Sequence, residues 1–220
     1  MDFALARTNM VKSQIIPNQI FNPDLLGGMM EISRESFVAT NIQNFAYSDL
    51  SLLLTEPQEA TGRRMLKPLQ AGSLIQSLEL VAGNRVLVVG AGTGYEAALL
   101  AYMGMSVFAL ENNTTLSNKG QKLLADQKII WRTGNLADGW PEEAPFDGIL
   151  FCGAIHAVPN NAVGQLGSSG RLVAIVGDKI SPLMRAVRIK GISGADRPDI
   201  LFETSANFLP SLEPPQSFKL

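Results

Sequence analysis

Three glycines and one acidic residue have the types and spacing to form a ligand site. Gly90, Gly92 and Gly94 follow an apolar run at residues 86–89, and Glu111 ends a second apolar run about 20 residues later. Glycines let a backbone turn tightly and come close to a ligand. A carboxylate can accept hydrogen bonds from both hydroxyls of a ribose. The pattern predicts a nucleoside site at the carboxyl ends of two neighbouring parallel strands.

The spacing argues against two phosphate-binding sites. A dinucleotide fingerprint has a third glycine where this chain has Tyr95, and a P-loop needs a Gly-Lys-Ser or Gly-Lys-Thr that does not follow these glycines. A site that holds a ribose without a pyrophosphate cradle suits S-adenosylmethionine. This interpretation requires an open cleft over Gly90 to Gly94, with Glu111 facing it.

Composition and charge limit the class of protein. The 220 residues are 46% hydrophobic and 17% charged, with a net charge of -2, which suits a protein with a substantial core and no general affinity for nucleic acid. The single cysteine, Cys152, suits a reducing cytoplasm. We expect no leader peptide and no membrane span, because no apolar run approaches about 18 residues.

Alternating helix and strand signals predict the fold. The pattern predicts an α/β fold, with helices on both faces of a mostly parallel seven-stranded sheet and an antiparallel C-terminal edge. The Gly-Ala-Gly-Thr-Gly turn followed by Glu111 resembles class I methyltransferases, which implies a Rossmann-like fold of that type. We expect an N-terminal extension at residues 1–64, a core at 65–210 and a loosely held tail at 211–220. The predicted strands are residues 86–89, 106–111, 128–133, 146–151, 171–177, 183–189 and 200–208.

Helix signals occupy most of the remaining chain. Asn22 can cap a helix that starts at Pro23, whereas residues 33–64 are interpreted as short strands and loops. Thr93 is expected before one helix, and Thr114 or Thr115 as the cap of another. The predicted helices are residues 2–16, 23–32, 65–80, 96–103, 114–125 and 160–166.

Seven short segments, in order, resemble the protein-L-isoaspartate O-methyltransferase family. The resemblance covers nearly the whole chain and implies an S-adenosylmethionine-dependent enzyme that methylates the α-carboxylate of isoaspartyl residues in damaged proteins. A carboxylate is already ionised at pH 7, so no general base is required, and the residues identify no catalytic acid or base. The matching segments are residues 10–15, 33–38, 46–49, 88–95, 139–142, 144–147 and 170–173.

The resemblance implies a set of donor-binding positions. Asn135 stands where the family has an acidic residue, and its amide keeps an acceptor for the adenine amine; the alternative is a simple turn residue. We expect the donor, or its product S-adenosylhomocysteine, to be bound by Gly90, Ala91, Gly92, Thr93, Glu111, Asn112, Asn135 and Leu136.

One departure from the family lies in the segment that borders the acceptor carboxylate. The family has a Thr-Ile-Ser-Gln-Pro segment there, whereas this chain has Arg64-Met65-Leu66-Lys67-Pro68. Leu66 replaces a hydroxyl that is tied to activity and cannot donate a hydrogen bond. Arg63, Arg64 and Lys67 either clamp an anionic acceptor or form a solvated loop.

Three functional hypotheses remain open. The chain is an isoaspartyl methyltransferase whose missing hydroxyl comes from elsewhere, a methyltransferase with a different anionic acceptor, or a non-catalytic protein that binds the donor. His156 and Cys152 follow the predicted fourth strand. They are either a loop histidine and a buried thiol or residues that contact the acceptor. With one His and one Cys, we expect no metal site. Monomer and homodimer both remain open.

Overall fold

The seven strands of the computed structural model form one sheet, which positions the predicted site. The structure describes residues 1–59, 61–179, 181, 183–191 and 197–215. The strand order is β3-β2-β1-β4-β5-β6-β7, parallel from β3 to β5 and antiparallel at β6 and β7. The expected fold class is therefore confirmed. The strands are β1 (Arg85–Val89), β2 (Ser106–Glu111), β3 (Ile129–Thr133), β4 (Phe146–Ile155), β5 (Leu166–Val176), β6 (Met184–Lys190) and β7 (Asp199–Thr204).

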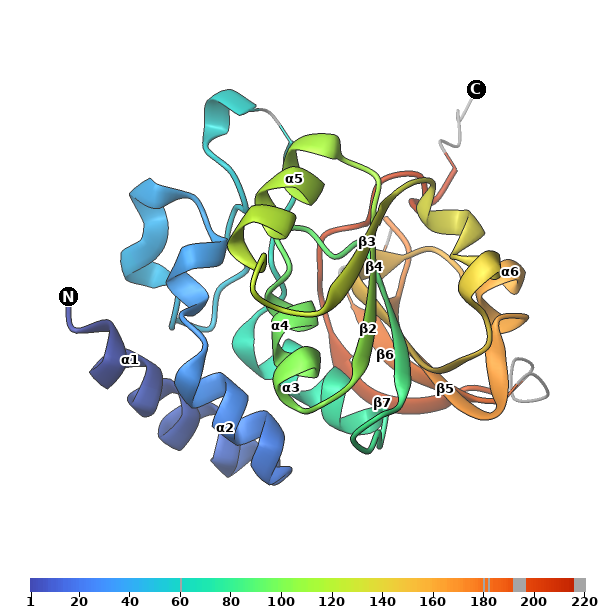
Figure 1. Ribbon diagram of the computed structural model, residues 1–220, viewed down its shortest axis with the longest axis horizontal. Helices are drawn as coiled ribbons and strands as arrows, with labels where there is room; N and C mark the ends of the chain where they lie inside the picture. Colours follow the sequence, from blue (N-terminus) through green and yellow to red (C-terminus); the bar gives the residue numbers. More distant parts are fainter. Residues whose placement is uncertain (60, 180, 182, 192–196, 216–220) are drawn as a thin grey trace.

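Alternate residues of β1 face two separate cores, as expected for a strand covered on both sides. Val86 and Val88 belong to the core under three helices, α3 (Pro68–Ser77), α4 (Tyr95–Tyr102) and α5 (Thr114–Leu123). Leu87 and Val89 belong to the core on the opposite face, beside the short helix α6 (Asn160–Val163). Figure 1 shows α3 and α4 on one side of the strands and α6 on the other.

The N-terminal helices belong to the same core as the sheet. Helix α1 (Phe3–Met10) continues through a π-helical turn (Val11–Ile15) and a 3-10 turn (Ile16–Asn18), and α2 (Pro23–Glu31) follows. As expected, Asn22 caps α2, because its Oδ1 accepts the Leu25 N–H at 3.0 Å. Met10, Ile15, Leu25 and Met29 are buried in the core that α3 and α4 also line. Residues 1–64 and 65–210 thus share one core, with α1 and α2 packed outside α3 and α4 (Figure 1).

Residues 33–64 contain fewer strands than predicted. Their described part forms three 3-10 turns (Arg34–Phe37, Thr40–Phe45 and Pro57–Glu59) and a single isolated antiparallel bridge, between Leu53 and Arg64. No apolar run in this segment is long enough to be buried as a strand, so its backbone groups pair within tight turns. The prediction of short strands was wrong apart from that bridge.

Three other local predictions need correction. Helix α3 begins at Pro68 instead of Met65, because a residue before proline avoids the helical conformation and Lys67 has ψ 151°. Gly94, with φ 97°, precedes the first residue of α4, whereas the Thr93 hydroxyl bonds elsewhere. Asn113 caps α5 in place of either threonine, because its Oδ1 accepts the Leu116 N–H.

The C-terminal segment is held more firmly than expected as far as it is described. Leu212 is 8% exposed and packs in the α6-side core, and its carbonyl accepts the His156 N–H at 2.7 Å. Glu213 Oε2 lies 2.8 Å from Lys179 Nζ. Residues 216–220 of the predicted tail lie outside the described residues.

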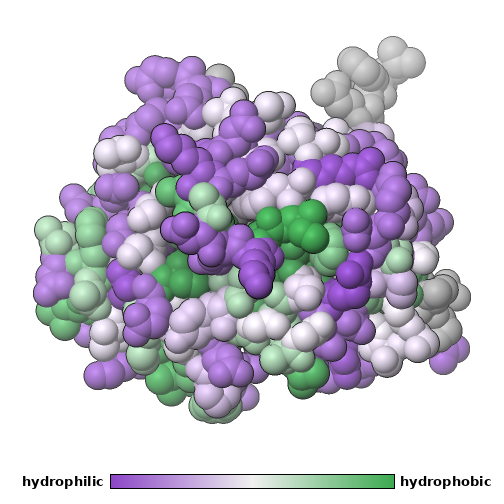
Figure 2. All heavy atoms as spheres, in the orientation of Figure 1, coloured by the Kyte–Doolittle hydropathy of each residue, from purple (hydrophilic) through white to green (hydrophobic). Residues whose placement is uncertain are grey.

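Hydrophilic side chains cover most of the visible face, with separate apolar spots among them (Figure 2). Scattered exposed apolar residues are normal for a folded domain. No helix in the described residues has the length and apolar character needed to cross a membrane.

Candidate active site

The predicted glycine turn forms at the carboxyl end of β1. Gly90, Gly92 and Gly94 have φ values of 72°, 60° and 97°, which residues with a side chain rarely adopt. The Gly90 and Ala91 N–H groups both donate to the carbonyl of Leu110 on β2, at 2.8 and 3.1 Å. The turn is therefore fixed directly beside the carboxyl end of the second strand, as a nucleoside site requires.

Glu111 lies beside this turn, but both oxygens of its carboxylate already accept hydrogen bonds within the chain. The side chain is 0% exposed. Oε1 accepts hydrogen bonds from Arg63 Nη1 at 2.9 Å and from the Asn113 N–H at 3.0 Å. Oε2 accepts the Gly92 N–H at 2.7 Å. The oxygens expected to receive ribose hydroxyls thus face an arginine and two backbone amides.

Side chains from elsewhere in the chain cover the glycine turn. Arg63, which is 5% exposed, donates its second N–H to the Gly90 carbonyl at 2.9 Å. A Cβ added at Gly92 would lie 2.6 Å from Leu54 Cδ1, and one added at Gly90 would lie 2.7 Å from Leu209 Cδ2. The surface where a ligand would approach the turn is therefore in contact with protein atoms.

The other residues predicted to bind the donor have varied surroundings. Ala91 and Thr93 are buried, and Thr93 Oγ1 donates to the Phe37 carbonyl at 2.6 Å. Asn112 has a buried Oδ1 without a partner among the described residues. Leu136 is fully buried in the α6-side core, whereas the neighbouring Asn135 is exposed.

A cavity lies beside this group, past the end of β3. Its volume is about 650 Å³, and its lining includes Arg132, Asn135, Glu142 and Gln165. Gly90 and Glu111 do not line it. Asn135 is therefore accessible from a cavity that lies outside the covered glycine turn.

The three cations of the substrate segment do not form a clamp. Arg63 is bonded to Glu111 and Gly90, and Arg64, which is exposed, donates to the Ser51 carbonyl at 2.8 Å. Lys67 Nζ lies 3.9 Å from Asp49 Oδ2, and Pro68 begins α3. Each cation thus has its own partner within the chain.

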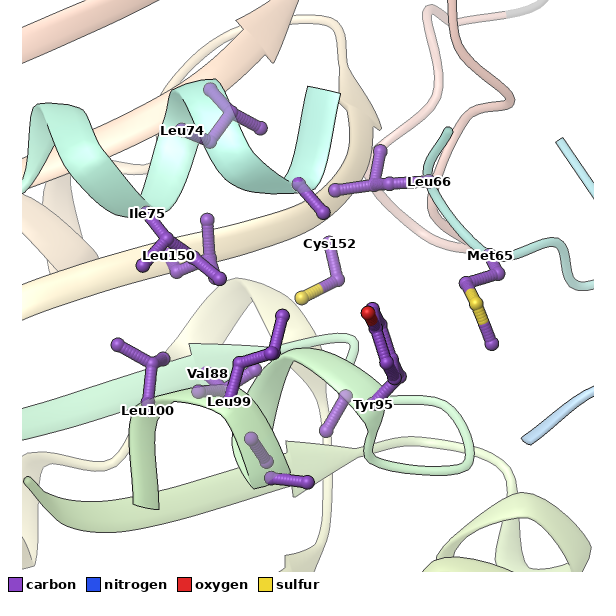
Figure 3. Packing of buried hydrophobic residues seen from close by; sticks show 14 of the residues in the cluster. Met65, Leu66, Leu74, Ile75, Val88, Tyr95, Leu99, Leu100, Leu150 and Cys152 are labelled. Atoms are coloured by element: carbon purple, nitrogen blue, oxygen red, sulfur yellow. The ribbon is translucent and has the colours of Figure 1, made fainter. Parts of the chain in front are cut away.

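Leu66 is a core residue in this structure. It is 3% exposed, and its side chain points toward Cys152, as does the Tyr95 hydroxyl (Figure 3). Burial raises the pKa of Tyr95 to about 12 and that of the Cys152 thiol well above its usual value. Both groups keep their protons at neutral pH, so Cys152 is not a nucleophile here.

A buried polar cluster lies between the glycine turn and the substrate segment. Arg34 is 0% exposed, donates to the Ala46 and Leu66 carbonyls at 2.8 and 2.6 Å, and lies 4.7 Å from the centre of the Tyr95 ring. Arg34 Nη1, Tyr95 Oη and Glu96 Oε1 are buried with no hydrogen-bond partner among the described residues. Buried polar atoms without a partner are costly and uncommon in folded proteins.

Glu96 in this cluster makes stability depend on pH. Burial raises its pKa above the usual carboxyl value, and the charges of Arg34 and Arg63 only partly oppose that effect. As the pH rises past the usual value, the unfolded chain loses a proton that the folded chain retains, so folding stability falls until the raised pKa is passed. We expect Glu96→Gln to raise the melting temperature at pH 8 by roughly 2 to 4 °C, equivalent to about 1 kcal/mol. The gain should shrink toward pH 4, as scanning calorimetry would measure.

Glu142 provides the matched control for Glu96. It is exposed, and the hydrogen bond from Arg132 lowers its pKa, so its contribution to stability is present above the usual carboxyl pKa and lost as the pH falls. Glu142→Gln should therefore give no gain at pH 8. A Glu96→Gln variant that melts below the wild-type protein at pH 8 would contradict the expected sign.

Two predictions remain, one for His156 and one for a metal site. His156 is exposed at the end of β4, and its backbone N–H is bonded to Leu212. The described residues contain no group of three or more His, Cys, Asp or Glu side chains that could hold a metal ion.

Arg63 and Arg34 are the residues that sequence reasoning placed least well. The sequence predicts Arg63 as part of an anion clamp or of a solvated loop, whereas the structure pairs it with Glu111, 48 residues away in the chain. Arg34 lies in a segment that resembles the family, and that resemblance was the one available signal. Neither arginine has a periodic pattern around it that predicts burial.

A parallel sheet with a glycine turn after its first strand and an acid at the end of its second defines a class I S-adenosylmethionine-dependent methyltransferase fold. The family model for protein-L-isoaspartate(D-aspartate) O-methyltransferase matches residues 6–202. The chain therefore belongs to the protein-L-isoaspartate O-methyltransferase family, which consists of enzymes that use S-adenosylmethionine and act on protein carboxylates.

Individual relatives agree with this assignment. The chain is 39% identical to a protein-L-isoaspartate O-methyltransferase of Pelotomaculum thermopropionicum over 79% of this chain and 75% of that protein. It is 32% identical to that of Syntrophotalea carbinolica over 91% of this chain and 92% of the relative.

Two solved structures share the fold. A protein-L-isoaspartate O-methyltransferase superposes with a TM-score of 0.78 at 22% identity, covering 94% of this chain and 67% of that chain. A putative member from Plasmodium falciparum, solved with S-adenosyl-L-homocysteine, gives a TM-score of 0.74 at 19% identity, covering 97% and 99%.

The predicted donor site has suitable residue types in an arrangement that does not fit a bound donor. Glu111 could accept ribose hydroxyls, but Arg63, Gly92 and Asn113 already bond to it. Leu54 and Leu209 cover the glycines from above. The predicted donor site is therefore closed in this structure.

Proposed function

We infer that this chain methylates a carboxylate of a protein or peptide with S-adenosylmethionine, and that Gly90, Ala91, Gly92, Thr93, Glu111, Asn112, Asn135 and Leu136 form its donor site. The observation that carries this inference is the position of Glu111 at the end of β2, beside the glycine turn that follows β1. A turn and an acid in this relation suit a ribose. The single cysteine supports a reducing, cytoplasmic location.

Methylation of the acceptor carboxylate depends on positioning more than on acid–base chemistry. The carboxylate is ionised at neutral pH, so holding one oxygen in line with the methyl group supplies most of what the chain must contribute. Leu66 offers no hydroxyl for this task. Tyr95 Oη is the group available to replace it. This oxygen is buried without a partner among the described residues and, like the Leu66 side chain, points toward Cys152 (Figure 3).

A different anionic acceptor is the second candidate function, favoured by the apolar, buried Leu66 at the family's hydroxyl position. Transfer of a labelled methyl group from S-adenosylmethionine to an isoaspartyl peptide separates the two. Saturable transfer, absent from the matched aspartyl peptide, supports isoaspartyl repair. Donor binding without transfer to that peptide leaves a different acceptor or a non-catalytic donor-binding protein. Absence of both donor binding and transfer, in the wild-type protein and in variants of the closing side chains, contradicts both.

Leu66→Ser tests whether the missing hydroxyl limits the reaction. The substitution removes most of a buried side chain and should lower the free energy of unfolding by about 2 to 4 kcal/mol. Leu66→Ala removes a similar volume without adding a hydroxyl, so it is the matched control. We expect the serine variant to methylate the isoaspartyl peptide at least tenfold faster than the alanine variant, because one donor at a reacting oxygen is worth roughly 100-fold or more. Equal rates would show that the hydroxyl is not limiting.

A further inference from the structure

The ion pair of Arg63 with Glu111 occupies the position predicted for the donor's ribose. Arg63 Nη1 lies 2.9 Å from Glu111 Oε1, and Nη2 lies 2.9 Å from the carbonyl of Gly90. One guanidinium thus connects the strand-end acid to the first glycine of the turn. Ribose hydroxyls would need the same carboxylate, so Arg63 and the ribose of a bound donor would compete for it.

Leu54 closes the same cleft from above the glycine turn. It is 3% exposed, and its Cδ1 lies 2.6 Å from where a Cβ at Gly92 would be. The middle glycine of such turns lets a ligand approach the backbone closely. Here the side chain of Leu54 makes that close approach instead.

Leu54 and Arg63 belong to one structural unit. The Leu54 N–H donates to the Arg63 carbonyl at 3.0 Å, and the Met65 N–H donates to the Leu52 carbonyl at 2.8 Å. The hydroxyls of Thr55 and Thr61 lie 2.8 Å apart nearer the tip. We call residues 52–59 and 61–65 the plug segment, because its two ends are paired and it carries both side chains into the cleft.

Among the described residues, few hydrogen bonds besides those of Arg63 join the plug segment to the rest of the protein. Lys119 of α5 donates to the Leu54 carbonyl at 3.1 Å, and the Ala39 N–H donates to the Leu53 carbonyl at 3.0 Å. Glu56 accepts the Thr40 N–H at 2.6 Å. A buried ion pair contributes little net stability, since its desolvation offsets its attraction. A ligand that satisfies Glu111 can therefore compete with Arg63.

We propose that the plug segment is an internal occupant of the methyl-donor cleft, with Arg63 in the ribose position, and that the donor binds only after this segment withdraws. The proposal rests on the function inferred above. It assigns Arg63 a role that opposes donor binding, in contrast to an arginine that contacts the donor or the acceptor. The apparent donor affinity is the intrinsic affinity multiplied by the fraction of molecules that are open.

Calorimetric titration with S-adenosylhomocysteine tests the proposal. Arg63→Ala frees the Glu111 carboxylate and removes the bond to Gly90, so we expect it to bind the ligand at least tenfold more tightly than the wild-type protein. Arg185→Ala is the matched control, because it removes an exposed arginine from β6. Its affinity should equal that of the wild-type protein.

Hydrogen exchange on the wild-type protein supplies a second test that needs no substitution. The Ala39 amide donates to the Leu53 carbonyl, so its hydrogen bond joins the plug segment to the rest of the protein. Saturating S-adenosylhomocysteine should speed exchange of this amide while it slows exchange in the glycine turn. This measurement decides the matter if Arg63→Ala does not fold.

The possible failures are distinguishable. Tight binding by the wild-type protein, with equal or weaker binding by Arg63→Ala, overturns the plug and leaves the proposed function intact. Ligand-induced protection of the Ala39 amide also overturns the plug. Both the plug and the proposed function are overturned if calorimetry shows no binding to the wild-type protein or to Arg63→Ala and the ligand changes no amide exchange.

Discussion

Replacing Glu111 by alanine is expected to lower the free energy of unfolding by about 3 to 5 kcal/mol, because it leaves the buried guanidinium of Arg63 without its counter-charge. Glu111 is 0% exposed and Arg63 is 5% exposed, so water cannot replace the lost carboxylate. The amides of Gly92 and Asn113 also lose their acceptor. Urea unfolding followed by circular dichroism measures the loss.

A double-mutant cycle shows how much of that loss belongs to the ion pair. Arg63→Ala alone leaves Glu111 buried and unpaired, and the double variant removes both charges. Because the two residues are in contact, we expect the loss in the double variant to be smaller than the sum of the two single losses by about 0.5 kcal/mol or more. Glu142→Ala, which removes an exposed partner of Arg132, should cause no measurable change. Additive losses at Glu111 and Arg63 would mean that the pair does not form in solution.

The parts of the fold that periodicity determines were predicted well. The buried runs at 86–89 and 106–111 became adjacent parallel strands, and the two last strands became the antiparallel edge. Apolar runs bounded by glycine and polar turns leave few other ways to bury the chain. The same reasoning placed Glu111 at a strand end beside the glycine turn.

The state of the candidate site was beyond the reach of that reasoning. Whether Glu111 faces a ligand depends on Arg63, which lies in a segment without regular periodicity and approaches through tertiary packing. Leu54 is similar, because its contact with Gly92 joins residues 38 positions apart in the sequence. A carboxylate that pairs with an arginine and one that awaits a ribose have the same sequence signature.

The closed cleft and the substituted acceptor segment are joined through one backbone stretch. Arg63 is bonded to Glu111 and Gly90, whereas the carbonyl of Leu66, three residues later, is held by Arg34. Withdrawal of the plug segment must therefore pull on a segment that is anchored at Leu66. Arg34 thus limits how far an opening motion can spread into the core.

Arg34→Met is the substitution expected to release that anchor, with a loss of about 3 to 5 kcal/mol in the free energy of unfolding. Replacing a buried charge by an apolar side chain is often neutral when its partner is removed as well. Here the acceptors are the carbonyls of Ala46 and Leu66, which remain buried, and each charged hydrogen bond contributes roughly 1.5 to 3 kcal/mol.

The control for Arg34 retains its charge. Arg34→Lys keeps a cation near the Tyr95 ring but can reach the two carbonyls less well than a guanidinium, whose donors are fixed in a fork. We expect its unfolding free energy to lie between those of the wild-type protein and Arg34→Met. The Met65 amide should also exchange faster in Arg34→Met, because Leu66 is no longer tied to the segment after α2. A methionine variant within about 1 kcal/mol of the wild-type protein, below the range for one charged hydrogen bond, would show that the two carbonyls do not depend on Arg34.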